Sequence, residues 1–99
     1  MAEHLVVLQP AEADLAEACD WYDSQETGLS VDFLRDVTKS FDSIREFPEM
    51  FEVVRGRYRR AITKRFPYVI YFKVEGETVE VHAVLHGSRS PSVWRRRLK

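Results

Sequence analysis

Two neighbouring runs of β-branched and aromatic residues constrain the fold of this chain most strongly. The runs are Tyr68 to Val74 and Thr78 to His86, and only Glu75, Gly76 and Glu77 separate them. Residues of these types favour a pleated strand, and a short connection that contains glycine is typical of a β-hairpin. We therefore predict that an antiparallel sheet forms in the second half of the chain.

The first half has the hydrophobic period of helices. Apolar residues recur at helical spacing from Pro10 to about Glu26 and again from about Ser30 to Phe47, where Pro48 ends the pattern. The connection is short, so we predict an antiparallel helical hairpin. The residues predicted to face the core are Ala11, Leu15, Ala18, Cys19 and Tyr22 in the first helix and Phe33, Leu34, Val37, Phe41 and Ile44 in the second.

Three shorter segments complete the predicted order. His4 to Leu8 is a first strand, Tyr58 to Lys64 is a strand with weak alternation, and Ser92 to Leu98 is either a short C-terminal helix or a basic tail. The predicted class is α+β, with an N-terminal strand and a helical hairpin on a mainly antiparallel sheet in the order β-α-α-β-β-β. The length of 99 residues predicts a single domain that spans residues 1–99.

Charge is distributed unevenly along the chain. Residues 1–54 contain 13 acidic and 3 basic side chains, whereas residues 55–99 contain 3 acidic and 12 basic ones. Such asymmetry between halves indicates an interaction surface of one sign. The alternative is an acidic helical layer and a basic sheet that are each merely solvated. We predict that the arginines between positions 55 and 97 gather on one side of the fold, where they suit a polyanion or an acidic protein.

Composition and motifs exclude several classes of chemistry. The single cysteine, Cys19, rules out an internal disulfide and favours a reducing cytoplasm. No apolar stretch approaches ~18 residues, and no basic segment followed by a long apolar run begins the chain, so we expect neither export nor a membrane partner. Phosphate-binding glycine loops and zinc motifs are absent. We expect no metal and no cofactor.

An ordered set of residues along nearly the whole chain resembles the RelE/ParE superfamily of type II toxin–antitoxin toxins. The set begins in the helices and continues through the sheet to the C-terminal segment. It comprises Ala18, Trp21, Tyr22, Gly28, Leu29, Phe33, Leu34, Ile44, Pro48, Arg59, Arg60, Arg65, Phe66, Pro67, Tyr68, Tyr71, Val84, Leu85, His86, Arg89, Pro91, Trp94 and Arg95. The sequence RFPY, followed by H-x-x-R, is similar to the ParE or plasmid stabilisation branch in particular.

This resemblance implies a bacterial growth inhibitor that a cognate antitoxin neutralises. Toxins of the ParE type poison DNA gyrase, whereas those of the RelE type cut mRNA on the ribosome. The resemblance therefore implies gyrase as the target, with the ribosome and mRNA as the alternative, and a homodimer is a further expectation. A third hypothesis, from another class, is a nucleic-acid-binding module without toxicity.

The residues themselves bear on the choice between the two targets. Metal-free RNA cleavage needs groups that transfer protons and cations that neutralise the phosphate. Histidine is the side chain that titrates near neutrality, so His86 is the candidate for proton transfer. If the chain were a nuclease, its set would be Arg59, Arg60, Lys64, His86 and Arg89. The ribosome-dependent nucleases often carry a functional tyrosine near the C-terminus, whereas here that region has Trp94, which cannot transfer a proton.

We therefore commit to no catalytic residue and predict a surface that binds the target. Its residues are Arg59, Arg60, Arg65, Tyr68, His86, Arg89, Trp94 and Arg95. Arginines in loops and in the C-terminal tail are favoured as binding residues, because packing does not require an arginine at those positions. A structural role remains open for several members: His86 as a strand-end histidine that bonds a carbonyl or an acid, Tyr68 as sheet packing, and Arg59 or Arg60 as partners of helix acids.

Overall fold

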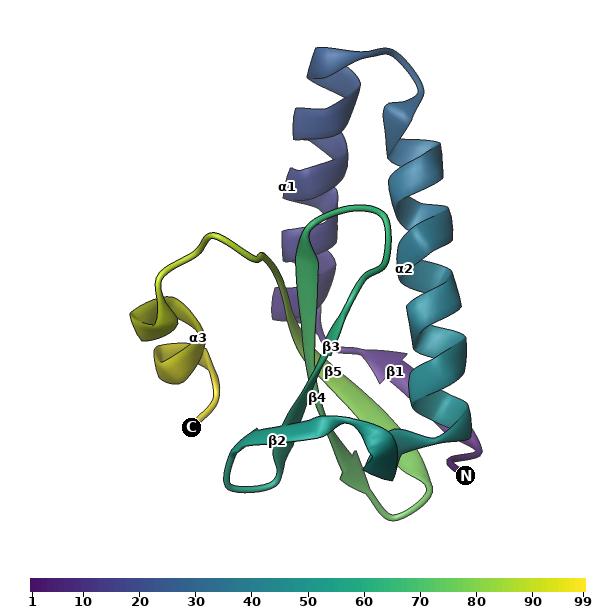
Figure 1. The fold of residues 1–99 in the computed structure, drawn as a ribbon, viewed down its shortest axis with the longest axis vertical. Helices are drawn as coiled ribbons and strands as arrows, with labels where there is room; N and C mark the ends of the chain where they lie inside the picture. Colours follow the sequence, from purple (N-terminus) through teal and green to yellow (C-terminus); the bar gives the residue numbers. More distant parts are fainter.

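The computed structural model describes all 99 residues, which form three layers. A hairpin of two long helices covers one face of a five-stranded sheet, and a short C-terminal helix covers the other face (Figure 1). The elements in chain order are β1 His4–Val7, α1 Gln9–Gln25, α2 Leu29–Glu46, the 3-10 turn η1 Pro48–Met50, β2 Glu52–Arg55, β3 Tyr58–Ile62, β4 Tyr68–Glu75, β5 Thr78–His86 and α3 Pro91–Arg97.

The sheet has the strand order β1-β5-β4-β3-β2. β1 runs parallel to β5, and all other neighbours are antiparallel. The predicted α+β class, the helical hairpin and the β4–β5 hairpin are confirmed, and Ser92–Leu98 resolves into a helix rather than a tail. Gly28 makes the tight turn between the helices with φ of 86°, a left-handed conformation that favours glycine.

Two features of the sheet differ from the prediction. β2 was not predicted, because a four-residue edge strand with only two apolar residues carries no clear period. β3 ends at Ile62 rather than Lys64, because Thr63 and the following loop turn back onto β4. The Thr63 hydroxyl hydrogen-bonds to the carbonyl of Phe66, and the Thr63 amide donates to the carbonyl of Tyr68 at 2.9 Å.

The core consists of two clusters, one on each face of the sheet. Fourteen buried residues lie between the helical hairpin and the sheet, and six lie beneath α3. The predicted core face of α1 is confirmed. In α2, Leu34 is an exception: its side chain is 40% exposed, because it lies at the border of the apolar stripe. No helix of the chain is both long enough and apolar enough to cross a membrane.

Candidate functional site

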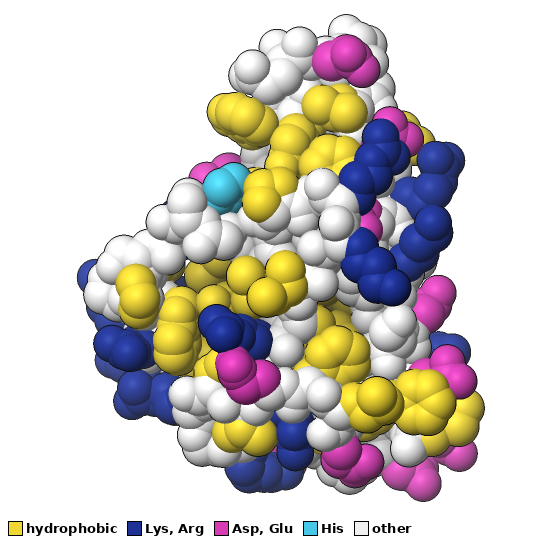
Figure 2. All heavy atoms as spheres, in the orientation of Figure 1, with side chains coloured by type: hydrophobic (Ala, Val, Ile, Leu, Met, Phe, Trp, Pro, Cys, Tyr) yellow, Lys and Arg dark blue, Asp and Glu magenta, His cyan; other side chains and the backbone are white.

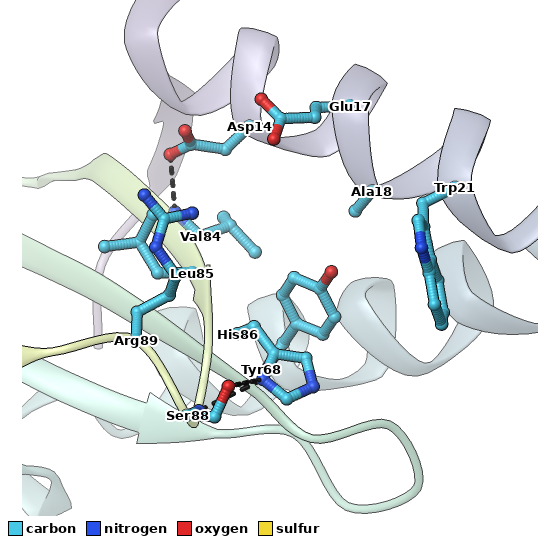
Figure 3. A pocket seen from close by; sticks show the side chains of 10 residues that line it. All are labelled: Asp14, Glu17, Ala18, Trp21, Tyr68, Val84, Leu85, His86, Ser88 and Arg89. Atoms are coloured by element: carbon cyan, nitrogen blue, oxygen red, sulfur yellow. Dashed lines mark hydrogen bonds between the residues drawn. The ribbon is translucent and has the colours of Figure 1, made fainter.

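A cavity of about 300 Å³ opens where α1 passes the end of β5 (Figure 3). Helix α1 contributes one wall and the ends of β4 and β5 contribute the other. The lining residues are Asp14, Glu17, Ala18, Trp21, Tyr68, Val84, Leu85, His86, Ser88 and Arg89. We call this the β5 pocket.

The β5 pocket exists because β1 is shorter than β5. β1 pairs with β5 only from Thr78 to Val81, after which the chain turns into α1. The remaining part of β5 therefore has a free edge that faces α1. Asp14 of α1 reaches this edge and accepts a hydrogen bond from the Val84 amide at 2.9 Å.

Arg97 of α3 joins the same edge from the opposite side. Its guanidinium forms two hydrogen bonds with the Asp14 carboxylate, at 3.2 and 2.9 Å, and a third with the His82 carbonyl at 3.0 Å. A paired guanidinium and carboxylate in this geometry are among the stronger polar contacts in proteins. The pair therefore ties α1, β5 and α3 together beside the β5 pocket.

Tyr68 forms the floor of the β5 pocket. It lies opposite His86 in the β4–β5 ladder, and the two rings meet edge to face at 5.4 Å. The residue is only 8% exposed, yet its hydroxyl has no hydrogen-bond partner within the chain and points toward α1 (Figure 3). Burial raises the pKa of Tyr68, so the hydroxyl remains protonated and can donate.

His86 and Arg89 contribute further donors to the β5 pocket. The Ser88 amide donates to His86 Nδ1 at 3.0 Å, so a neutral ring carries its proton on Nε2. The Arg89 guanidinium has no carboxylate partner within 4.0 Å in the chain. The structure thus brings three of the predicted residues, Tyr68, His86 and Arg89, around one cavity.

A second group of predicted residues lies on the face covered by α3. Trp94 stacks on Tyr71 of β4 with ring centroids 5.6 Å apart and planes 20° apart, and the Arg95 guanidinium lies 5.3 Å from the Trp94 ring centre. Burial raises the pKa of Tyr71, and the nearby charge of Arg60 opposes that shift. We call Arg60, Trp94 and Arg95 the α3 surface.

Arg59 and Arg60 do not act as a pair. Successive residues of a strand point to opposite faces. Arg59 donates to the backbone carbonyls of Phe51 at 2.7 Å and Glu49 at 3.3 Å, whereas Arg60 forms an ion pair with Glu52 at 2.8 Å. Arg59 therefore holds η1 and β2 in place and is not available to a target.

Lys64 and Arg65 lie in a third place, on the loop between β3 and β4. They line a hollow of about 440 Å³ beside α2, together with Asp36 and Lys39. Arg65 lies 4.0 Å from Asp32, and its backbone amide donates to Asp36. Neither residue belongs to the β5 pocket or to the α3 surface.

The prediction that the arginines gather on one side is wrong. Figure 2 shows basic side chains along the α2 side, around α3 and at the opposite end of the molecule from the helical turn. Arg57, Arg60 and Arg97 pair with carboxylates of their own chain, at 2.9, 2.8 and 2.9 Å. Periodicity could not reveal this, because the pairing partners lie far away in sequence.

The set required for RNA cleavage is not brought together. Arg59 and Arg60 point to opposite faces, Lys64 lies beside α2, and His86 and Arg89 border the β5 pocket. The chain also has no group of three or more His, Cys, Asp or Glu side chains that could hold a metal ion.

Sequence reasoning missed the helical wall of the β5 pocket. Asp14, Glu17 and Trp21 lie on one stripe of α1 at spacings of three and four residues, next to the apolar stripe. Trp21 is 56% exposed, which is unusual for so large an apolar side chain. That stripe, with its tryptophan and two acids, was the signal available in the sequence.

Comparisons with known proteins agree with this fold. The model of a family described as "ParE toxin of type II toxin-antitoxin system, parDE" matches residues 5–91. Among solved structures, the chain is similar to one described as "Chromosomal ParDE TA system from P. aeruginosa", with a TM-score of 0.75 and 16% sequence identity. That match covers 84% of this chain and 94% of the other. No curated protein sequence matches at a significant level.

Proposed function

Because this chain belongs to the ParE toxin family, we propose that it inhibits DNA gyrase without cutting nucleic acid. The family match makes it the toxin component of a type II toxin–antitoxin system, for which a cognate antitoxin is the expected partner. The fold alone does not specify the target, since one fold carries many functions. The choice between gyrase and the ribosome therefore rests on the arrangement of the site residues.

One observation carries the choice of an inhibitor over a nuclease. General acid–base cleavage requires the proton-transfer group and the phosphate-binding cations to contact the same phosphodiester. Of the four cations in the nuclease set, only Arg89 lies with His86 at the β5 pocket, whereas Arg59 is bonded to backbone carbonyls, Arg60 lies on the other face of the sheet and Lys64 lies beside α2. This separation supports a protein that acts by binding.

The α3 surface is the part of the chain that we propose to contact gyrase. Tryptophan and arginine are the residue types that most often dominate the energy of protein interfaces. Trp94 is partly exposed and its ring is held by stacking on Tyr71, so it loses little conformational freedom on binding. Arg95 is exposed next to it and makes no ion pair in the chain.

A supercoiling assay with purified gyrase tests this proposal. We expect the free chain to inhibit supercoiling and the Arg95→Gln and Trp94→Phe variants to need about tenfold more protein for the same inhibition, because each loses about 1.4 kcal/mol of interface energy. Arg55→Gln is the matched control, since Arg55 is exposed on β2 and has no ion-pair partner. Equal inhibition by all four proteins would refute the role of the α3 surface.

Induction of the chain without its antitoxin tests the choice of target in cells. Filamentation with double-strand DNA breaks is expected for a gyrase inhibitor. Rapid loss of translation with mRNA cuts on the ribosome would instead support the nuclease. Complete loss of toxicity in a folded His86→Ala variant would also count for proton-transfer chemistry, because that substitution removes the one candidate base.

A further inference from the structure

The hollow between α2 and the β3–β4 loop has a lining that neither the β5 pocket nor the α3 surface shares. Its volume of about 440 Å³ lies within the range of small-molecule sites. Charged and polar side chains come from α2 and from the loop, and apolar ones come from the edge of the sheet. We call it the α2 hollow.

Three cations line the α2 hollow from two separate elements. Lys39 belongs to α2, and Lys64 and Arg65 belong to the loop. Figure 2 shows basic side chains gathered along this side of the molecule. Neither lysine has a carboxylate within 4.0 Å, and the Arg65 guanidinium only reaches Asp32 at 4.0 Å, with its side chain 68% exposed. The chain therefore leaves this positive charge available to a ligand.

The backbone that carries two of these cations is fixed in the free protein. Asp36 Oδ2 accepts hydrogen bonds from the amides of Arg65 and Phe66, both at 2.9 Å. The Arg65 guanidinium also lies 5.5 Å from the centre of the Phe66 ring. Because the loop is already ordered, a ligand that binds here does not have to order it, which lowers the entropic cost of binding.

The rest of the lining supplies hydrogen-bonding atoms and an apolar surface. Asp36 Oδ1 and the Ser40 hydroxyl make no hydrogen bond within the chain, and both remain accessible, because no buried side-chain oxygen lacks a partner. Phe51 and Ala61 line the side of the hollow formed by the sheet. Phe51 packs edge to face on Phe72 at 5.8 Å, so its ring is held in place.

This combination defines the chemistry of a matching ligand. Lysine and arginine bind phosphate oxygens through charge-assisted hydrogen bonds. An aspartate carboxylate accepts from hydroxyl donors and commonly binds a ribose in nucleotide sites. A simple phosphate ion would leave Asp36 without a donor and would be repelled by its charge. A duplex is too large for a hollow of this volume.

We propose that the α2 hollow binds a small phosphorylated molecule that carries free hydroxyls and an apolar ring, which is the chemical class of a mononucleotide. Its phosphates lie among Lys39, Lys64 and Arg65, and a sugar hydroxyl donates to Asp36. The bound ligand links α2 to the β3–β4 loop. The inference goes beyond gyrase inhibition and does not depend on it.

Isothermal titration calorimetry of the free chain with ADP tests the cations. We expect a dissociation constant of about 0.1–1 mM at low salt, and Lys39→Gln and Arg65→Gln should each weaken binding about 3- to 10-fold. Asp36 bonds the backbone of Arg65 and not its side chain, so the variant keeps the loop in place. Arg55→Gln is the matched control, since Arg55 is exposed on β2 and does not line the hollow. Absence of ADP binding at about 10 mM, or equal weakening by all three variants, would overturn the inference.

Two competitors test the remainder of the ligand. Pyrophosphate should bind at least about threefold more weakly than ADP, because it lacks the hydroxyls and the ring. Equal affinity would refute a role for Asp36 and Phe51. A DNA duplex should not displace ADP, and displacement by equimolar duplex would assign the hollow to nucleic acid instead.

Amide chemical shifts measured by NMR test the location. Addition of ADP should shift the amides of Ser40, Arg65 and Phe66 and should leave those of His86 and Trp94 unchanged. Shifts confined to His86 or Trp94 would place the ligand elsewhere and overturn the inference. Gyrase inhibition stands or falls separately, because the supercoiling assay measures it through Trp94 and Arg95.

Discussion

Asp36 shows how one buried carboxylate on a helix helps to fix the loop between β3 and β4. The residue lies on α2 and is 7% exposed. One of its oxygens accepts hydrogen bonds from the backbone amides of Arg65 and Phe66, both at 2.9 Å. The loop between β3 and β4 therefore depends on a residue about thirty positions earlier in the chain.

Removal of this carboxylate should destabilise the protein measurably. We expect Asp36→Ala to lower the free energy of unfolding in urea by about 2–3 kcal/mol, because two amides lose a charged acceptor. Asp32→Ala, four residues earlier on the same helix, removes only exposed ion pairs and should cost less than about 1 kcal/mol. Similar losses in the two variants would show that the amides of the loop find water instead.

Asp23 should make stability depend on pH at the turn between the helices. Hydrogen bonds from the Ser30 amide and hydroxyl, at 2.9 and 2.8 Å, lower the pKa of Asp23. A carboxyl group with a lowered folded-state pKa stabilises the fold above its unfolded pKa of about 3.9, and the contribution disappears as the pH falls through the folded-state value.

The measurement for Asp23 is the unfolding free energy of the chain and of Asp23→Asn across a pH series. The chain should be more stable than the variant at pH 6, and the difference should shrink as the pH falls below about 4. Asp42→Asn, on the exposed part of α2, is the control and should show no comparable trend. A stability difference that stays constant with pH would mean that the hydrogen bonds do not favour the charged form of Asp23 over its protonated form.

At the scale of elements, α3 is attached by few contacts and Arg97 provides the main polar one. Arg97 joins Asp14 and the His82 carbonyl, while Leu98 is fully buried against the sheet. Val93 and Trp94 of α3 pack against the second core cluster, whereas Arg95 and Arg96 face solvent. Release of α3 would expose the apolar side chains of the second core cluster, including Tyr71 and Leu85.

Loss of Arg97 should loosen α3 selectively. We expect Arg97→Gln to reduce stability by about 1–2 kcal/mol and to speed tryptic cleavage after Arg95 and Arg96 at least several-fold, because the guanidinium–carboxylate bonds are lost. Arg96→Gln is the control for stability, since Arg96 contacts only the Ser92 carbonyl of its own helix. If both variants unfold alike, the apolar contacts of Val93, Trp94 and Leu98 hold the helix without the ion pair.

The elements were predictable from sequence where the period was strong and long. Helices α1 and α2 and the β4–β5 hairpin fall within one or two residues of their predicted bounds. β2 was not predicted, because its pairing depends on β3 and on the contact of Arg59 with the Phe51 carbonyl.

The site was predictable only in part. The motifs RFPY and H-x-x-R singled out Tyr68, His86 and Arg89. That these residues lie next to α1 follows from the length of β1, which no local sequence pattern encodes.

At the scale of the whole molecule, the charge asymmetry between the two halves of the sequence does not produce one acidic side and one basic side in the folded chain. The acidic half supplies the carboxylates that the basic half needs, as in Arg97 with Asp14 and Arg60 with Glu52. In the folded chain, much of the positive charge that seemed available for a partner is therefore paired with carboxylates of the chain itself. After β5, the cations that remain exposed and without a carboxylate partner are Arg89, Arg95, Arg96 and Lys99.

Weak and shallow salt dependence of nucleic acid binding follows from this count. A duplex that meets these four cations displaces about four counterions, so log K should fall against log salt with a slope no steeper than about −4, or about 250-fold between 50 and 200 mM. Fluorescence anisotropy with a labelled DNA duplex measures the slope directly. The double variant Arg95→Gln, Arg96→Gln should reduce it to about −2, whereas Arg57→Gln should leave it unchanged, because Arg57 is already paired with Glu75. A slope of about −6 or steeper would mean that the paired arginines open toward the phosphates, and the toxin would then have to be considered a nucleic-acid binder first and a gyrase inhibitor second.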